Sequence, residues 1–321
     1  MARVDALVAP VAARQDRSSR QPGGPVSTAL YERMTPEDLA AVEGALEGST
    51  RLNWDRASPA ERVLLAPIFA AAYDITGALQ RTGLVRAEPP EHVHAMARGP
   101  LAHGGEPALG DLVVRAFDEA GCGLPGEGRV LDFGCSSGRV VRVLGAYRPD
   151  LEWLGCDPNA DAIAWAAEHL PMARFFTSPT VPPLEFDDGS IDRAYAISIW
   201  SHFSRSAALA WLTEMHRVLR PGGALLLTTH GLDTVAYQLR RDLMTRDSAA
   251  ETAGALLRDG TQFFSIFGED GDWGVKDPDW GTGYLAADWL AAHVTPAWAI
   301  RLYRPGMLDG NQDVFVLERR P

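Results

Sequence analysis

The stretch from Val130 to Val140, VLDFGCSSGRV, constrains the fold of this chain more than any other. An apolar pair leads into Asp132, Gly134 and Gly138 bracket a loop of small residues, and an aliphatic segment begins at Val140. This order predicts a strand, a tight turn and the start of a helix. Glycine tolerates positive φ, and exposed N–H groups at a helix N-terminus favour an anion. The loop is therefore predicted to hold a small anionic ligand.

Composition narrows the class of protein. The chain has 321 residues, of which 46% are hydrophobic, and this is enough for a substantial core. Its formal net charge of −12 repels polyanions, so nucleic acid is not expected as a partner. Apolar stretches end well before the roughly 20 residues that span a bilayer, and the first residues lack the apolar core of a signal peptide. We expect a cytoplasmic protein without a membrane partner.

No metal site is predicted. The three cysteines give neither a disulfide framework nor a metal-binding spacing. His92, His94 and His103 lie close together in sequence, but no cysteine or carboxylate stands at a spacing that would complete three or four ligands.

The first third of the chain predicts helices. Residues 1–27 mix Arg, Ser, Pro and Gly without periodicity and are expected to form a flexible arm. Residues 28–105 are expected to form a helical cap, because Thr35 and Ser58 are each followed by proline and an acidic first turn. An apolar stripe follows Ser58 at helical spacing, and it predicts packing in the core or in a homodimer through these helices.

From Arg129 onward, strand and helix patterns alternate, which predicts a mostly parallel sheet covered on both faces. Asp157 ends the second strand, where an acidic residue accepts hydrogen bonds from ribose hydroxyls. A nicotinamide-binding fold would require G-x-G-x-x-G, whereas here Ser136 replaces the middle glycine and the spacing is one residue shorter. The strands are predicted at residues 129–133, 152–156, 173–177, 192–198, 224–229, 298–303 and 313–318.

Four segments in order, VLDFGCSSG, GCDPN, LEFDDGSIDRAYAISIWSHFS and RVLRPGG followed by ALLLTTHG, resemble the successive motifs of class I S-adenosylmethionine-dependent methyltransferases. The resemblance implies an α/β, Rossmann-like fold with a seven-stranded, mostly parallel sheet of order 3-2-1-4-5-7-6. It implies a methyltransferase domain over residues 106–321, with an insertion between strands five and six at residues 232–290. The implied cofactor is S-adenosylmethionine, and S-adenosylhomocysteine is the product.

The resemblance also implies site residues. Asp132 would face the methionine amino group, Asp157 would hold the ribose, and Ser198 would approach the sulfonium. Either Thr177 or Ser178 would meet the adenine amine. The full set implied to bind the cofactor is Asp132, Gly134, Cys135, Ser136, Gly138, Asp157, Pro158, Asn159, Ser178, Ser198 and Ile199.

Candidates for the acceptor side follow strands four and five. His202 and His230 have the chemistry of a general base, although each could instead hold a loop or a helix in place. The aromatic insertion is predicted to act as a lid, and the expected acceptor contacts are Trp200, Phe264, Trp280 and Tyr284. We expect a small-molecule acceptor such as a natural product or a sugar, with O-methylation ahead of N- or C-methylation. The alternative is a protein that binds S-adenosylmethionine for structure or for a non-methylating rearrangement.

Overall fold

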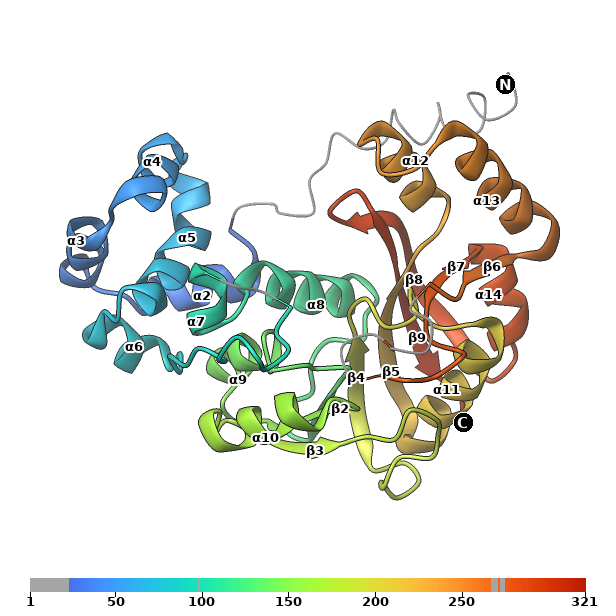
Figure 1. Ribbon diagram of the computed structural model, residues 1–321. Coiled ribbons are helices and arrows are strands. Elements are labelled where there is room, and N and C mark those ends of the chain that lie inside the picture. Colours follow the sequence, from blue (N-terminus) through green and yellow to red (C-terminus); the bar gives the residue numbers. More distant parts are fainter. Residues whose placement is uncertain (1–22, 97–98, 267–270, 272–274) are drawn as a thin grey trace. The chain divides into compact units, whose positions relative to one another are not determined.

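The computed structural model describes residues 23–96, 99–266, 271 and 275–321 (Figure 1). The chain divides into two compact units. The N-terminal unit comprises Gln21–Arg115 and Leu124–Ser178, and the C-terminal unit contains Ala116–Gly123 and Pro179–Pro321. Residues 1–22 of the predicted arm lie outside the described residues.

The N-terminal unit contains most of the helices that were predicted as a cap. Figure 1 shows α3 to α6 on the side of this unit away from β2 (Glu152–Asp157) and β3 (Ala173–Thr177). Both predicted caps are present, since Thr35 accepts the Asp38 N–H and Ser58 accepts the Glu61 N–H. The helices are α2 (Pro25–Glu32), α3 (Pro36–Ala45), α4 (Gly48–Arg56), α5 (Pro59–Ala72), α6 (Thr76–Thr82), α7 (Pro100–Gly104), α8 (Pro107–Glu119), α9 (Val141–Tyr147) and α10 (Ala160–His169).

Helix α2 begins inside the segment predicted to be a flexible arm, and this corrects the boundary at residue 27. Pro25 occupies the first turn. One carboxylate oxygen of Asp111 accepts the N–H groups of Val26 and Ser27 at 2.7 and 2.9 Å, and the other accepts the Ser27 hydroxyl at 2.7 Å. Asp111, which is distant in sequence, thus accepts hydrogen bonds from N–H groups at the start of α2 that lack a partner within the helix.

The apolar stripe of α5 is buried within its own unit. Ala66, Ile68, Phe69 and Ala70 join a core cluster with Trp54 and residues of α2, α3 and α6. The stripe therefore has a partner inside the chain, and the packing requires no second copy.

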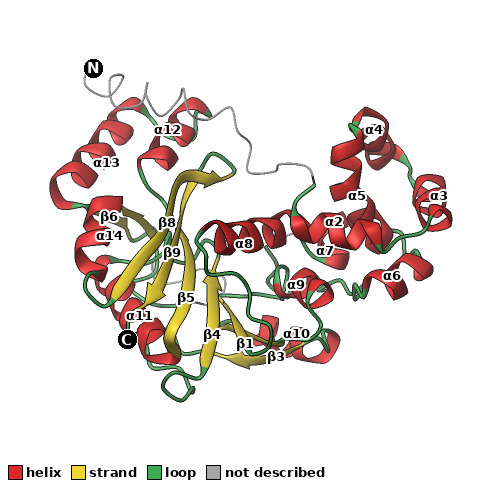
Figure 2. Cartoon of the chain, turned by 180° about the vertical axis from the view of Figure 1, so that it is seen from behind, coloured by secondary structure: helices red, strands yellow, loops and turns green. Residues whose placement is uncertain are grey.

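The C-terminal unit contains strands of a large sheet and a separate two-stranded hairpin. Figure 2 shows β5, β8 and β9 as long strands, with α12, α13 and α14 grouped to one side of them. Its strands are β4 (Ile191–Ala196), β5 (Leu219–Thr229), β8 (Trp298–Leu308) and β9 (Gln312–Arg319), together with the separate hairpin of β6 (Thr261–Phe264) and β7 (Thr282–Leu285). Its helices are α11 (Arg205–Val218), α12 (Leu232–Arg240), α13 (Arg246–Asp259) and α14 (Ala287–Val294).

The large sheet has seven strands in the order β3-β2-β1-β4-β5-β9-β8, where β1 is Arg129–Phe133, β2 is Glu152–Asp157 and β3 is Ala173–Thr177. The pairs β1/β2, β2/β3 and β4/β5 are parallel, and β9 runs antiparallel to β5 and β8. Since β8 and β9 are the sixth and seventh strands of this sheet, the predicted order 3-2-1-4-5-7-6 and the Rossmann-like fold are confirmed.

Several bounds differ from the prediction. Strand β4 ends at Ala196 instead of residue 198, and β8 continues to Leu308 instead of ending at residue 303. Strand β5 begins at Leu219 instead of residue 224, because the segment Arg220–Gly223 is accommodated as a register shift against β4. The sequence predicts one helix in the insertion after β5, over residues 248–257, whereas the structure has α12, α13 and the β6/β7 hairpin there.

Candidate active site

The loop between β1 and α9 contains three residues with positive φ. Gly134 and Gly138 have φ of 81° and 78°, and Ser136 between them has φ of 48°. A left-handed conformation costs a non-glycine residue about 1–2 kcal/mol. The N–H of Ser136 donates to Asp157 Oδ2 at 2.8 Å, and its hydroxyl donates to the His94 carbonyl at 3.4 Å. These two bonds hold the serine in the conformation that the loop requires.

The backbone N–H groups of this loop bind within the protein. Gly134 and Cys135 donate to the carbonyl of Cys156 at 2.8 and 3.0 Å, and Gly138 donates to the carbonyl of Cys135 at 2.9 Å. With the N–H of Ser136, four donors are satisfied internally. The prediction that exposed N–H groups of the loop bind an anion is therefore wrong for these four, because the loop closes onto the end of β2.

Asp157 ends β2, as predicted, and is half-buried. Its Oδ1 accepts the Asn159 N–H at 2.9 Å, and its Oδ2 accepts the Ser136 N–H at 2.8 Å. Burial raises the pKa of Asp157 above its ordinary value, and these two hydrogen bonds act in the opposite direction. A carboxylate oxygen carries two lone pairs, so each oxygen can accept one further hydrogen bond. Asp157 thus fits the two adjacent hydroxyls of a ribose.

The residues around Asp157 have local partners. The side-chain oxygen of Asn159 caps α10 by accepting the Ala162 N–H at 3.0 Å, and Pro158 precedes it. Ser178 follows β3, and its N–H donates to the carbonyl of Asp157 at 3.1 Å. The ends of β2 and β3 are thus joined where the adenine side was predicted.

Cys135 and Asp132 are both buried. A Cβ added to Gly155 would lie 3.0 Å from Cys135 Sγ, so the thiol packs over β2. Burial, followed by the charges of Asp132 and Asp157, raises the pKa of Cys135 well above its ordinary value. The thiol stays protonated and is no nucleophile. Any contact of Cys135 with a cofactor would come from its backbone.

Arg142 on α9 fastens the segment before α8 to the helix that follows the glycine loop. Its Nη1 donates to the carbonyls of Ala87, Ala102 and His103 at 2.9, 3.1 and 2.7 Å. Burial lowers the pKa of Arg142 to about 10, which leaves it charged at neutral pH. The bond from Ser136 to His94 also holds this segment, which contains His92, His94 and His103. The segment therefore has a structural role, which the spacing of its histidines did not indicate.

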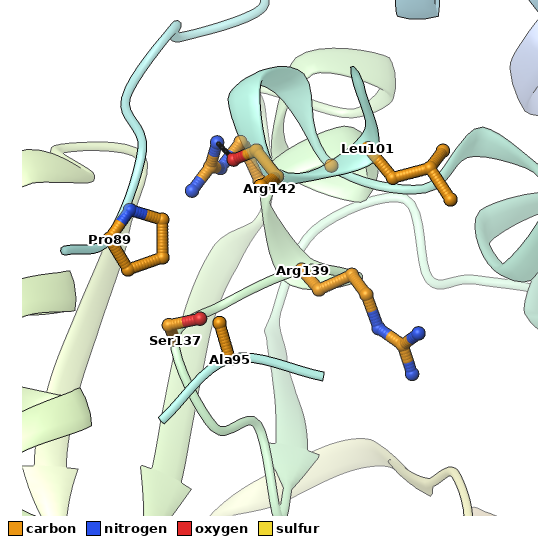
Figure 3. Close-up of a pocket in the computed structure, with 8 residues that line it drawn as sticks. Pro89, Ala95, Leu101, Ser137, Arg139 and Arg142 are labelled. Atoms are coloured by element: carbon orange, nitrogen blue, oxygen red, sulfur yellow. Dashed lines mark hydrogen bonds between the residues drawn. The ribbon is translucent and has the colours of Figure 1, made fainter. Parts of the chain in front are cut away.

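Figure 3 shows residues that line a small cavity beside this segment, with Ser137 and Ala95 next to each other and with Pro89, Arg142 and Arg139 around them. Its volume is about 10 Å³. Because a cavity of this size holds about one water molecule, it cannot accommodate a cofactor.

Ser198 and Ile199 follow β4 in the C-terminal unit. Ser198 has φ of 61°, and its N–H donates to Thr228 Oγ1 at 2.7 Å. The hydroxyls of Ser198 and Thr228 both donate to Gln312 Oε1, at 3.2 and 2.6 Å. Gln312, which sequence reasoning missed, thus connects the ends of β4, β5 and β9.

His202 lies between its own loop and the segment that leads into β7. Its Nδ1 is 2.8 Å from the carbonyl of Gly281, so this nitrogen carries a proton and Nε2 is the acceptor in the neutral ring. Its ring stacks on Trp280 at 4.6 Å between centroids. The N–H of Gly281 donates in return to the carbonyl of His202 at 2.8 Å. The structure thus brings together two predicted site residues that are far apart in sequence.

His230 follows β5 and faces the same insertion. Its ring lies 5.0 Å from that of Tyr284, and its carbonyl accepts the Leu285 N–H at 2.9 Å. Burial, together with the charge of His202, lowers its pKa to about 4, so the ring is neutral at physiological pH. His230 Nδ1 is buried and has no hydrogen-bond partner among the residues that the structure describes.

The four predicted aromatic contacts differ in placement. Tyr284 is buried, with its hydroxyl donating to Gln238 at 2.9 Å, and Phe264 packs edge-on to it. Trp280 is half-buried against His202. Trp200 is fully buried, and its indole N–H donates to the carbonyl of Ala208 at 3.3 Å. Contact of Trp200 with an acceptor would require this packing to open.

Asp313 is a buried carboxylate that the sequence pattern did not indicate. Asp313 is the first residue of β9 that pairs with β5. Its carboxylate accepts the Gly306 N–H at 2.9 Å and the Tyr303 hydroxyl at 3.0 Å. Burial, with the charge of Asp233, raises its pKa to about 7. A Cβ on Gly231 would lie 2.4 Å from Asp313, so the residue after His230 must be glycine for this carboxylate to fit.

The described ranges hold neither a cluster of metal ligands nor a single helix able to cross a membrane. No group of three or more His, Cys, Asp or Glu side chains in them could hold a metal ion. No single helix there has the length and apolar character to cross a membrane; α5 and α6, which are bent by 117°, reach that threshold only when taken together.

Residues 130–223 match the family described as the methyltransferase domain. A protein of Streptomyces fradiae, an uncharacterised 37.1 kDa protein in transposon TN4556, is 29% identical over 140 residues, which is 42% of this chain and 39% of that protein. The chain thus aligns with about two fifths of this relative's length.

Solved structures overlap the chain at low identity. A S-adenosylmethionine-dependent methyltransferase of Methanosarcina mazei is 20% identical, with a TM-score of 0.45, over 61% of this chain and 94% of that one. The 4+2 cyclase SpnF is 15% identical, with a TM-score of 0.43, over 74% of this chain and 86% of the cyclase.

The strand order, the glycine loop with Asp157 and the match of residues 130–223 to the methyltransferase domain are consistent with a class I S-adenosylmethionine-dependent methyltransferase. The family match implies S-adenosylmethionine as the cofactor.

Proposed function

We propose that this methyltransferase transfers a methyl group to an oxygen atom of a small-molecule acceptor, with His202 as the proton acceptor. The observation that carries the proposal is the tautomer of His202. Its Nδ1 proton is directed at the Gly281 carbonyl, which makes Nε2 the basic atom of the neutral ring. In its neutral form, an imidazole held in this orientation can remove a proton from a hydroxyl as it attacks.

Asp157 and the glycine loop, two parts of the proposed cofactor site, belong to the N-terminal unit. Asp157 would accept hydrogen bonds from the ribose, and the backbone at Gly134 and Gly138, held by internal hydrogen bonds, would form the wall for the methionine part. S-adenosylmethionine supplies an electrophilic methyl group on a sulfonium ion. The task of the protein is therefore to orient the acceptor and to manage one proton.

His230 is proposed to orient the acceptor and not to take its proton. With a pKa of about 4, its ring is a weak base at neutral pH. Its buried Nδ1, which has no partner among the described residues, can accept a hydrogen bond from a hydroxyl without becoming protonated. The division of roles between the two histidines follows from this difference.

The acceptor is proposed to be a small, partly apolar molecule such as a natural product or a sugar derivative. Support comes from the aromatic side chains of Phe264, Trp280 and Tyr284 in the insertion and from the net charge of −12, which disfavours a nucleic acid. A non-methylating use of S-adenosylmethionine is the competing function. The labelling experiment described next distinguishes it from methyl transfer.

The test is incubation of the full chain with methyl-labelled S-adenosylmethionine and a small-molecule extract of the source cells. We expect one labelled product, and the ¹³C shift of its methyl group should identify an O-methyl ether. His202→Gln should lower kcat by about 10²–10⁴-fold, the range for loss of a general base. His293→Gln, an exposed histidine on α14, is the matched control and should retain activity.

Each outcome is decisive. Tight cofactor binding without any labelled product would contradict methyl transfer and support the competing function. A labelled N-methyl or C-methyl group would overturn the assignment to oxygen. If H202Q kept the wild-type rate across the pH range, His202 would not be the proton acceptor.

A further inference from the structure

A second cavity of about 300 Å³ lies entirely within the C-terminal unit. It is bordered by α11, by the loop at residues 180–182 and by the segment from Val275 to Trp280. Pockets for small molecules start at about this volume. The residues on which its chemistry depends are Phe203, Trp211, Trp280, Asp277, Asp279 and Ala210.

Aromatic rings form one side of this cavity, and their orientations are fixed by mutual packing. Phe203 stacks with Trp211 at 6.3 Å between centroids and meets Trp280 edge-on at 5.8 Å. Trp280 is supported in turn by the ring of His202. A wall that is already ordered loses little conformational entropy when a flat ligand binds to it.

Two carboxylates stand beside this aromatic wall. Asp279 Oδ1 accepts the hydroxyls of Ser204 and Ser206 at 2.5 and 3.0 Å, and Asp277 Oδ1 accepts the Asp279 N–H at 2.9 Å. Neither carboxylate forms an ion pair within the part of the chain that the structure describes. Their hydrogen-bond partners are neutral donors, which fix the position of the carboxylates without forming an ion pair with them.

We propose that this cavity binds a small organic cation with a flat apolar body, of the class of protonated arylalkylamines. The aromatic faces attract a cation through their quadrupoles and cover the ring of the ligand, and the two carboxylates supply the opposite charge. This site goes beyond the proposed methyl transfer, because occupation of the cavity requires neither the cofactor nor a reaction. An occupant would contact Trp280, the ring on which His202 stacks.

The test uses tryptamine as the probe and its neutral analogue 3-ethylindole, titrated into the full chain by isothermal calorimetry. Tryptamine should bind at least tenfold more tightly than 3-ethylindole. The double variant Asp277→Asn, Asp279→Asn should weaken tryptamine binding by about tenfold or more. The control Asp187→Asn, Asp247→Asn changes the net charge equally at exposed positions and should bind like the wild type.

Ala210→Phe provides a second test, because it fills the cavity from an exposed position of α11 and should therefore fold normally. This variant should abolish tryptamine binding while its thermal unfolding midpoint stays at the wild-type value. Equal binding of tryptamine and 3-ethylindole would overturn the proposal, as would undiminished binding to either variant. Absence of tryptamine binding to the wild type would overturn it as well, whatever the result of the methylation assay.

Discussion

Asp313 and His230 are expected to make the stability of this protein depend on pH in opposite directions. Burial raises the pKa of Asp313 from 3.8 to about 7, and the hydrogen bonds from Gly306 and Tyr303 only partly oppose this. Burial lowers the pKa of His230 from 6.5 to about 4. Folding thus favours the neutral form of both side chains.

The sign and size of each contribution follow from linkage between protonation and folding. Asp313 binds its proton more tightly when folded, so its contribution is full below pH 3.8 and is lost as the pH rises through about 7. This loss amounts to about 4 kcal/mol. His230 contributes fully above pH 6.5, and its contribution of about 3 kcal/mol is lost as the pH falls through about 4. In the pH interval where both groups titrate, the two contributions to the free energy of unfolding therefore change in opposite directions.

The assay is urea-induced unfolding of the wild type, Asp313→Asn and His230→Gln at steps between about pH 4 and pH 8. Relative to D313N, the wild type should lose about 4 kcal/mol of unfolding free energy as the pH rises through this range. Relative to H230Q, it should gain about 3 kcal/mol, because the variant lacks the depressed histidine. Curves for wild type and variant that run parallel would refute the reasoning for that residue.

Two further changes test the cofactor site and a helix cap. Asp157→Ala should weaken S-adenosylhomocysteine binding by about 10²-fold in calorimetry, because the hydrogen bonds to a charged acceptor are lost; an unchanged affinity would show that the ribose lies elsewhere. Ser58→Ala should lower the free energy of unfolding by about 1 kcal/mol, since the N–H of Glu61 loses its partner at the start of α5. Urea unfolding measures this loss, and the Thr35 cap should be unaffected.

The sequence predicted those features that depend on local chemistry. The N-caps at Thr35 and Ser58, the turn glycines Gly134 and Gly138, and the acidic end of β2 are each determined by residues close together in the chain. The strand order came from the resemblance of four motifs to a known family, and the structure confirms it.

What the sequence missed depends on partners that are distant along the chain. Asp111 satisfies the start of α2, which lies 85 residues earlier, and no pattern near Val26 indicates this. Gln312 joins Ser198 and Thr228 across more than 80 positions. The glycine loop shows the same limit, because its N–H groups were expected to face a ligand but bind the end of β2.

The insertion after β5 makes the largest difference to how function is assigned. Its residues Gly281 and Gly283 donate to the carbonyls of His202 and Ser201, and Leu285 donates to the carbonyl of His230. Both candidate histidines are thus positioned by backbone that lies beyond residue 223, where the family match ends. Residues shared with the family define the cofactor, whereas the surroundings of both histidines are set by a segment outside the match. Relatives that share only residues 130–223 therefore carry no information about the acceptor, and replacement of the insertion should alter acceptor choice while leaving cofactor affinity intact.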